Sequence, residues 1–309
     1  MPRDHYIAQT YLKEFIDSQT GMVHVHQKSG QYHPARTRDI CFEMDGSNNS
    51  YFSEPRIIEE YLRVFEPRWT GCVAALQERR LDAEIKYIIS GYIAFLRACN
   101  PTARRLQQAN MEFILESIRP YEARNIVANH AQRDIENPAE LVSALLDPRL
   151  RMEVDSEYTT AIGMQNLIAS QKIYFRSPWM VVYNETDNPF ITCDFPATYW
   201  YFRENYHIAN VHFPITPNIA IHIMPAPHDI ADEIIPPDQY GATERRRIKM
   251  FNRLVAQSAE KFVISNKREP WLPPLVSKYR NWRTESIHQH LYTPDGSYII
   301  NQLRVRERQ

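Results

Sequence analysis

Glycine is scarce in this sequence, and the motifs built on it are missing. The chain has eight glycines and 21 prolines among 309 residues. It contains no GxGxxG, GxxxxGKS, GxxxxGKT or GxSxG motif. These glycine-rich loops are the signatures of dinucleotide-binding folds, P-loop NTPases and α/β-hydrolases. Their absence argues against all three classes.

Paired cysteines and long apolar runs are lacking as well. No CxxC pair occurs, which predicts reduced, mostly buried thiols in place of a zinc knuckle or disulfide framework; the four cysteines are Cys41, Cys72, Cys99 and Cys193. The N-terminus lacks the apolar stretch of a signal peptide, and no window approaches the roughly 20 apolar residues of a membrane span. We therefore expect a cytoplasmic protein with no membrane partner.

Neither sign of charge dominates. Lys and Arg total 36, Asp and Glu total 37, and the formal net charge is -1. No global field therefore attracts polyanions, so any contact with nucleic acid must come from a local patch. Apolar residues make up 43% and charged residues 24% of the chain. These fractions are close to globular averages and allow a buried core.

Hydrophobic periodicity divides the chain into three parts. Residues 1–54 contain an alternating segment at 22–27 and a second candidate strand at 40–42. Residues 55–170 have helical spacing, with breaks at Asn100-Pro101, Asn137-Pro138 and Asp147-Pro148. Residues 171–309 are β-rich, with one late helix at about 243–259.

The β-rich runs indicate an antiparallel sheet, because they follow one another too closely for helical crossovers. The runs are KIYF, WMVVY, FITCDF, ATYWYF, NVHFPI, IAIHIM and KFVIS, followed by HQHLYT and GSYIINQLRV. We predict an α+β fold in which the helical middle block packs with a mainly antiparallel C-terminal β-sheet. The N-terminal segment should join this sheet, and the three parts should form one integrated domain.

His5 and Gln9 are candidate site residues near the N-terminus. They are four positions apart, which places both on the same side of either a helix or a strand. They should therefore face the same space. One interpretation is a catalytic histidine with a polar neighbour, and the other is a structural latch made by a hydrogen-bonded histidine.

The segment FITCDFP supplies a second candidate pair. Strand alternation places Thr192 and Asp194 on one face, with the acid just before Pro196. A carboxylate at a strand end can bind a metal or orient a histidine. It can equally accept backbone hydrogen bonds as a turn cap.

The late helix carries an amide in its apolar stripe and a set of basic residues elsewhere. Asn252 falls among Ile248, Phe251 and Val255, so it must brace a neighbouring backbone or point into a site, because an unpaired buried amide is costly. The basic residues form either a solvated face or a phosphate-contacting one; they are Arg245, Arg246, Arg247, Lys249 and Arg253.

Metal binding has weaker support in the sequence. On a strand, each of the pairs His24/His26 and His288/His290 would point both imidazoles one way, but neither has a third ligand nearby. Residues 84–86 match the (D/E)xK part of a common nuclease core, yet they lie in a strongly helical window where that core needs a strand. The sequence therefore neither requires nor excludes a divalent metal as a cofactor.

Four segments carry, in order, patterns that occur together in one family. The first is close to H-Y-x-P-Q-x-x-L-x-x-F and is matched by His5, Tyr6, Gln9, Leu12 and Phe15, with Ala8 in place of the usual proline. The second is close to P-F-I-T-S-D-x-P and is matched by residues 189–196, with Cys193 for serine and Phe195 for the usual asparagine. FPITPNIAIHI and Asn252 with SAEKFVIS match the third and fourth.

These segments resemble the domain-of-unknown-function 4238 family, a mostly bacterial group, over nearly the whole chain. The resemblance implies a related fold but no established reaction. Some members act in antiphage defence, so the resemblance implies, by analogy, a defence effector.

We predict a toxin-like or defence effector in the cytoplasm, with hydrolase-type chemistry directed at nucleic acid or nucleotides. In this hypothesis His5 is the general acid or base, Gln9 holds substrate or water, and Asp194 orients His5 or binds a metal. Binding residues would be Thr192, Asn252, Arg245, Arg246 and Lys249. The alternative is a non-catalytic sensor of a phage or host component. A homo-oligomer is compatible with either hypothesis.

Overall fold

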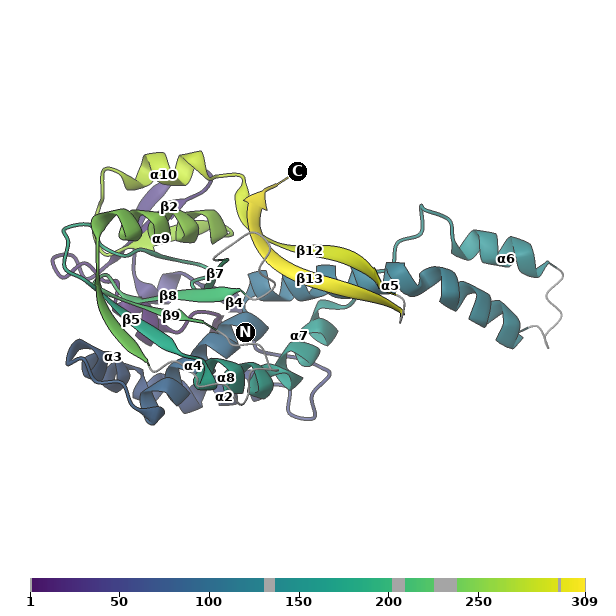
Figure 1. Cartoon of the computed structure of the whole chain (residues 1–309), viewed down its shortest axis with the longest axis horizontal. Helices are drawn as coiled ribbons and strands as arrows, with labels where there is room; N and C mark the ends of the chain where they lie inside the picture. Colours follow the sequence, from purple (N-terminus) through teal and green to yellow (C-terminus); the bar gives the residue numbers. More distant parts are fainter. Residues whose placement is uncertain (1, 131–136, 202–208, 225–237, 294–295, 309) are drawn as a thin grey trace.

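The computed structural model describes residues 2–130, 137–201, 209–224, 238–293 and 296–308. It has the α+β fold that the periodicity predicts. Figure 1 shows a central sheet with helices of the middle block on one side and the late helices on the other. The four cysteines are buried and unpaired, as expected.

The N-terminal segment forms short strands and one helical turn. Strand β1 (Arg3–His5) pairs with β4 (Phe42–Met44), and helix α1 spans Gln9–Lys13. Strands β2 (Val23–Gln27) and β3 (Tyr32–Ala35) form a hairpin, and η1 (Thr37–Asp39) follows it. The strand expected at 40–42 begins only at Phe42, because Cys41 has a positive φ of 56° that interrupts extended backbone.

The middle block is helical, as its spacing predicts. It contains α2 (Ile57–Phe65), η2 (Glu66–Arg68), α3 (Trp69–Gln77), α4 (Ala83–Cys99), α5 (Pro101–His130), α6 (Pro138–Leu145), α7 (Ser156–Gln165) and α8 (Leu167–Arg176). The Asp82 side chain caps α4 by accepting a hydrogen bond from the Ile85 N–H at 2.9 Å. Residues 84–86 lie in α4, so they cannot form the strand of a nuclease core.

One predicted β run is wrong. KIYF, at residues 172–175, belongs to the last turns of α8. The buried residues of this helix are Leu167, Gln171 and Tyr174, which follow helical spacing of three and four. A run of four residues is too short to show that periodicity.

The largest sheet has the order β10-β5-β9-β8-β7. Its strands are β5 (Trp179–Asn184), β7 (Thr198–Trp200), β8 (Asn210–Thr216), β9 (Ile219–Ile223) and β10 (Gln239–Thr243). Neighbours are antiparallel except β10 and β5, which are parallel. Val181 of β5 belongs to the core shared with α4, and Val182 packs with residues of the late helix α9 (Arg245–Ser258). The sheet is therefore covered on both faces.

A second sheet brings the N-terminal hairpin together with two strands from the C-terminal part of the chain. Its order is β3-β2-β11-β6, with β6 at Thr192–Cys193 and β11 at Phe262–Ser265. The N-terminal hairpin thus pairs with C-terminal strands, as predicted, although in a sheet separate from the largest one.

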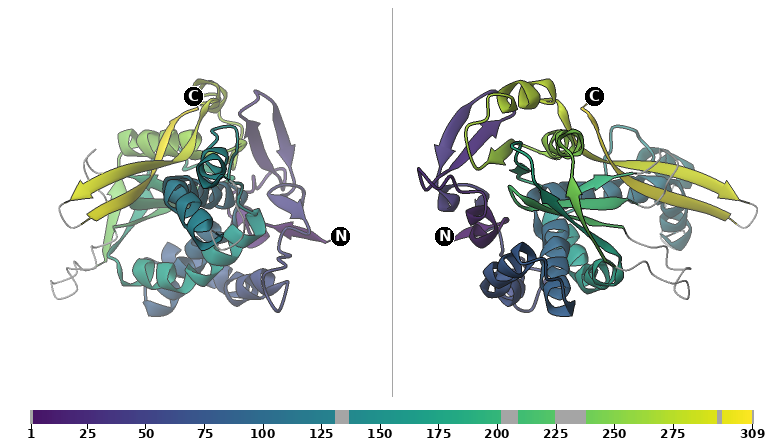
Figure 2. Two further views of the ribbon diagram at one scale, coloured as in Figure 1. Left: turned by 90° about the vertical axis from the view of Figure 1, so that its right-hand side faces the viewer. Right: turned by 60° about the vertical axis from the view of Figure 1, so that its left-hand side comes forward.

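The chain continues through α10 (Leu272–Lys278) into a long hairpin of β12 (Trp282–Thr293) and β13 (Gly296–Glu307). Figure 2 shows this hairpin reaching outward from the body in both views. It rests on α5, where the His288 imidazole stacks on the Phe113 ring with centroids 4.1 Å apart.

Candidate functional site

His5 and Gln9 do face the same space. Both line one cavity of about 180 Å³, which also contains Glu59 and Glu66. His5 is the last residue of β1 and Gln9 the first of α1, so the bend between these elements brings the two side chains together. Arg3, Asp4, Thr10, Ser47 and Leu62 complete the lining.

The His5 imidazole is held on one side and free on the other. It hydrogen-bonds with the backbone of Arg38, while its buried Nε2 has no hydrogen-bond partner among the described residues. Burial lowers the pKa of His5 from its ordinary 6.5, although the Arg38 contact opposes this. The ring is therefore neutral at neutral pH and able to accept a proton.

The cavity also contains carboxyl groups in two different environments. Arg56 pairs with Asp4 at 2.7 Å and with Glu59, and its hydrogen bond to Glu59 lowers the pKa of that acid. Burial raises the pKa of Glu66, and the nearby Glu59 charge adds to that shift. Proton transfer between Glu66, His5 and a bound molecule is chemistry that this lining could perform.

Thr192 lies elsewhere, deep in the core. Its hydroxyl is 2.6 Å from the Tyr11 hydroxyl, and Tyr11 in turn donates to the Pro214 carbonyl at 2.9 Å. All three groups are buried, and the Tyr11 ring stacks on Phe213 with centroids 5.3 Å apart. Tyr11, which the sequence argument did not select, is therefore the link between α1 and the FITCDF segment. No local pattern indicated this contact, because Thr192 lies 181 positions away in the chain.

Asp194 is occupied by backbone groups. Its carboxylate accepts hydrogen bonds from the N–H groups of Glu260 at 2.8 Å, Lys261 at 2.6 Å and Phe262 at 3.3 Å. Burial raises its pKa to about 6, and the bonds from Glu260 and Lys261 oppose the shift. No hydrogen bond or ion pair among the described residues joins Asp194 to His5. The geometry matches the turn cap that the sequence left open.

Asn252 braces a neighbouring segment. Its Oδ1 accepts a hydrogen bond from the Ile191 N–H at 3.2 Å, and its Nδ2 donates to the Pro189 carbonyl at 2.8 Å. The side chain is buried, so these bonds satisfy the amide as the apolar stripe of α9 required. Asn252 therefore ties α9 to the backbone that leads into Thr192.

The basic side chains of α9 are exposed to solvent. Among the described residues, one ion pair involves them, between Arg245 and Asp187 at 3.8 Å. We call this set the basic face of α9; it consists of Arg245, Arg246, Arg247, Lys249 and Arg253.

Metal ligands do not gather anywhere in the described part of the chain, in which no group of three or more His, Cys, Asp or Glu could hold an ion. His24 and His26 both contact the Tyr32 ring, so their imidazoles do point one way. His24 is already bonded to Tyr32 at 2.7 Å and Asp17 at 3.1 Å. His288 packs on α5, and the side chain of His290 lies outside the described residues.

Comparison with known proteins gives one match. The family model described as "Protein of unknown function (DUF4238)" matches residues 3–269. No curated protein and no solved structure matches the chain. Within the described residues, no helix combines the length and the apolar character needed to cross a bilayer.

Proposed function

The chain belongs to the DUF4238 family, whose description assigns no function, and we propose that it is a cytoplasmic effector that binds nucleic acid or nucleotides through the basic face of α9. Binding has more support than hydrolysis by the pair His5 and Asp194, because the Asp194 carboxylate is taken up by backbone N–H groups. The observation that carries the proposal is the exposure of the basic face with a single ion pair among the described residues.

The arrangement of α9 supports a phosphate contact. Arg246, Lys249 and Arg253 are separated by three and four residues, so they project from one side of the helix. The opposite side is fixed to the sheet by the buried Ile248 and Phe251. The cations therefore sit on a rigid element and act as a local patch, as the net charge of -1 requires.

The test is binding of short single-stranded RNA, single-stranded DNA and duplex DNA, measured by fluorescence anisotropy over a range of salt. The logarithm of the binding constant should fall with the logarithm of salt by about 0.9 for each phosphate neutralised on duplex, or about 0.7 on a single strand. The double variant Arg246→Glu/Lys249→Glu should bind more weakly and reduce this slope.

The matched control is Lys172→Glu/Arg176→Glu, which makes the same charge change on exposed residues of α8. It should bind like the unmodified protein, because α8 lies across the sheet from α9 (Figure 1). Equal weakening in both double variants, or no binding at low salt, would reject the basic face as the binding surface.

Hydrolase-type chemistry is the second candidate, and the unpaired Nε2 of His5 favours it. The acid partner on the same cavity would be Glu66, and Gln9 would hold substrate or water. His5→Ala should then abolish cleavage of bound nucleic acid or nucleotide, assayed with and without divalent metal, while leaving binding unchanged. Binding without any cleavage by the unmodified protein would favour the non-catalytic sensor.

The biological role we propose is antiphage defence, with the sensor as the alternative to a toxin-like effector. Cells that express the gene should reduce phage plating, and the double variant Arg246→Glu/Lys249→Glu should lose that protection. A His5→Ala variant that folds and still protects would indicate the sensor. Unchanged plating by the unmodified gene across a broad phage panel would count against a defence role.

A further inference from the structure

Arg97 is a cation that has no anionic partner among the described residues. It lies near the end of α4, partly buried, and none of the ion pairs among the described residues includes it. Its guanidinium stacks over the Tyr199 ring at 3.8 Å from the centroid and hydrogen-bonds with the Tyr174 side chain. A guanidinium has five N–H donors, so these contacts leave most of its donor capacity unused. A charge held away from water without a counter-charge is costly unless a ligand supplies one.

Two cavities meet at this side chain. The first, of about 220 Å³, lies between α4, α5, α7 and α8, and its polar lining includes Gln107, Asn110, Asn166 and Ser170. The second, of about 90 Å³, lies toward β7 and β13 and is lined by Tyr199, Asn301 and Leu303, among others. Arg97, Gln107 and Asn110 line both cavities. One molecule could therefore occupy both and contact the same three side chains.

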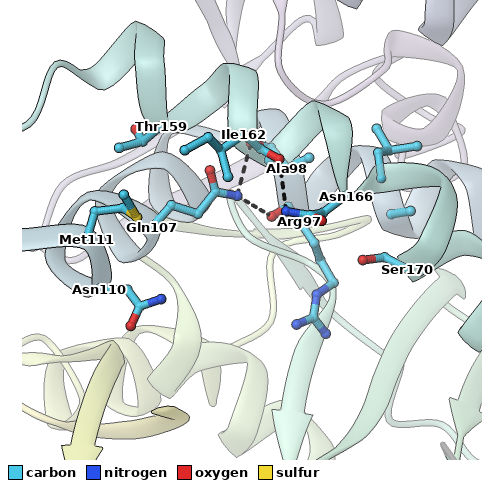
Figure 3. A pocket seen from close by; sticks show the side chains of 12 residues that line it. Arg97, Ala98, Gln107, Asn110, Met111, Thr159, Ile162, Asn166 and Ser170 are labelled. Atoms are coloured by element: carbon cyan, nitrogen blue, oxygen red, sulfur yellow. Dashed lines mark hydrogen bonds between the residues drawn. The ribbon is translucent and has the colours of Figure 1, made fainter. Parts of the chain in front are cut away.

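Only the nitrogen of the Gln107 amide has hydrogen-bond partners among the described residues. Its Nε2 donates to the carbonyls of Arg97 at 3.2 Å and Ala98 at 3.4 Å, but its buried Oε1 has no hydrogen-bond partner in the residues that the structure describes. Figure 3 shows the Arg97 guanidinium directed away from this amide, with Asn110 on one side and Ser170 on the other. The site thus offers unused donors at Arg97 and an unused acceptor at Gln107.

We propose that these two cavities form a binding site for a small organic anion, whose phosphate or carboxylate group contacts Arg97 and whose N–H or O–H group donates to Gln107. A forked guanidinium recognises either oxyanion by paired hydrogen bonds. The site is separate from the basic face of α9 and does not depend on it. It would bind a metabolite-sized molecule, because the two cavities together approach the lower size of ligand pockets.

The test is isothermal titration of the full chain with inorganic phosphate, the ribonucleoside monophosphates, glucose 6-phosphate, succinate and citrate. At least one compound should bind, and whether it is a phosphate or a carboxylate identifies the headgroup. Arg97→Met should weaken that binding by roughly tenfold or more, because charge-assisted hydrogen bonds are lost. Arg63→Met, the same change at an exposed arginine of α2 that lines neither cavity, should bind the compound normally.

A pair of variants at Ser170 keeps the test valid if Arg97→Met fails to fold. Ser170→Asp adds a carboxylate to the first cavity, which would neutralise Arg97 and exclude an anion. Ser170→Asn changes size similarly without adding charge. Binding should be lost in Ser170→Asp and kept in Ser170→Asn. No binding of any compound to the unmodified protein, or equal binding to both Ser170 variants, would overturn the proposal.

Discussion

Asp194 accepts hydrogen bonds from three successive backbone N–H groups, at residues 260–262. Glu260 and Lys261 lie between α9 and β11, and Phe262 begins β11, which pairs with β6; β6 ends one residue before Asp194. The Asp194 carbonyl also accepts a hydrogen bond from the Asn100 side chain at 2.8 Å, at the junction of α4 and α5. One acid therefore holds three separate parts of the chain in place.

Asp194→Asn should destabilise the fold. An amide presents an NH₂ group where one carboxylate oxygen now accepts N–H donors, and hydrogen bonds to a charged group contribute about 1.5–3 kcal/mol each. We expect the free energy of unfolding to fall by about 2–3 kcal/mol, measured by urea denaturation. The exposed Asp39→Asn should change it by less than about 0.5 kcal/mol. Equal stability of the two variants would show that Asp194 is not a structural cap.

Asn252 and His5 show what local pattern can and cannot predict. Helical periodicity places Asn252 among buried apolar residues, which correctly predicts that its amide needs partners. The partners, Pro189 and Ile191, lie about sixty positions away, and nothing local encodes them. The spacing of His5 and Gln9 predicts their shared cavity, but Glu66 enters it from another element.

Ala8 stands where the family pattern has proline, and a hydrogen bond from its backbone explains why alanine fits this position. Its N–H donates to the Tyr92 hydroxyl at 2.9 Å, in the buried core. Proline has no N–H to give. This chain therefore gains a hydrogen bond between its N-terminal segment and α4 at that position.

Helices α5 and α6 lie to one side of the body (Figure 1), and α6 has no buried residue. One contact that holds α6 against α5 is made by Arg119 of α5. Its guanidinium donates to the carbonyls of Leu145 at 2.9 Å, Asp147 at 2.5 Å and Leu150 at 2.8 Å. These carbonyls include the unpaired end of α6, so Arg119 caps that helix from outside.

Arg119→Lys should loosen α6 without affecting the rest of the fold. A lysine is a single point donor and cannot reach three carbonyls at once. We expect faster amide hydrogen exchange at residues 138–146 and unchanged exchange in α4 and the largest sheet, measured by mass spectrometry. Arg124→Lys, at an exposed position on α5, serves as control. Unchanged exchange at 138–146 would mean that α6 is held by other contacts.

Strand β10 was not predicted, whereas its partner β5 was. QYGAT has an exposed, glycine-containing pattern, and its partner in the sheet is parallel and more than fifty positions earlier. Such pairing depends on the path of the intervening chain. By contrast WMVVY reads as a strand because both of its faces are covered and every position is apolar.

Across the whole molecule, burial lowers the pKa of several histidines. The pKa of His26 falls to about 4 and that of His222 to about 3, both mainly through desolvation. The pKa of His212 also lies well below its ordinary 6.5. His212 and His222 are paired across β8 and β9, with ring centroids 5.1 Å apart and the Phe251 ring beside both.

These histidines should make the fold sensitive to acid. Below pH 6.5, the unfolded chain takes up protons that the folded chain excludes, so stability falls with pH by about 1.4 kcal/mol per pH unit for each such histidine. Asp194 has the opposite effect, because its pKa is raised to about 6 in the folded chain. Between roughly pH 6 and 4 the folded chain binds one proton at Asp194 that the unfolded chain does not, which stabilises the fold as pH falls. Glu14 and Glu66 also have raised pKa values and act in the same direction as Asp194. The net effect is still destabilisation as pH falls, because the three histidines and the acids with lowered pKa values outnumber them; those acids are Asp17, Glu59, Glu116, Asp147, Glu157 and Glu285.

His212→Leu should reduce this sensitivity. Within the described part of the chain, neither ring nitrogen of His212 has a hydrogen-bond partner, so removing the imidazole loses no hydrogen bond seen there. At neutral pH the free energy of unfolding should be unchanged or higher. Below pH 6.5 its dependence on pH should become less steep, by the amount that corresponds to about one proton. Urea denaturation at a series of pH values measures both. An unchanged slope would mean that His212 is protonated in the folded chain.

The proposed Arg97 site is assembled from two regions of the chain, and the family model covers only one of them. Arg97, Gln107 and Asn110 lie within residues 3–269, which the family model covers, whereas Asn301 and Leu303 of β13 lie beyond them. Substitutions in the β13 wall would therefore leave the oxyanion contact at Arg97 in place and alter only the contacts with the rest of the bound molecule.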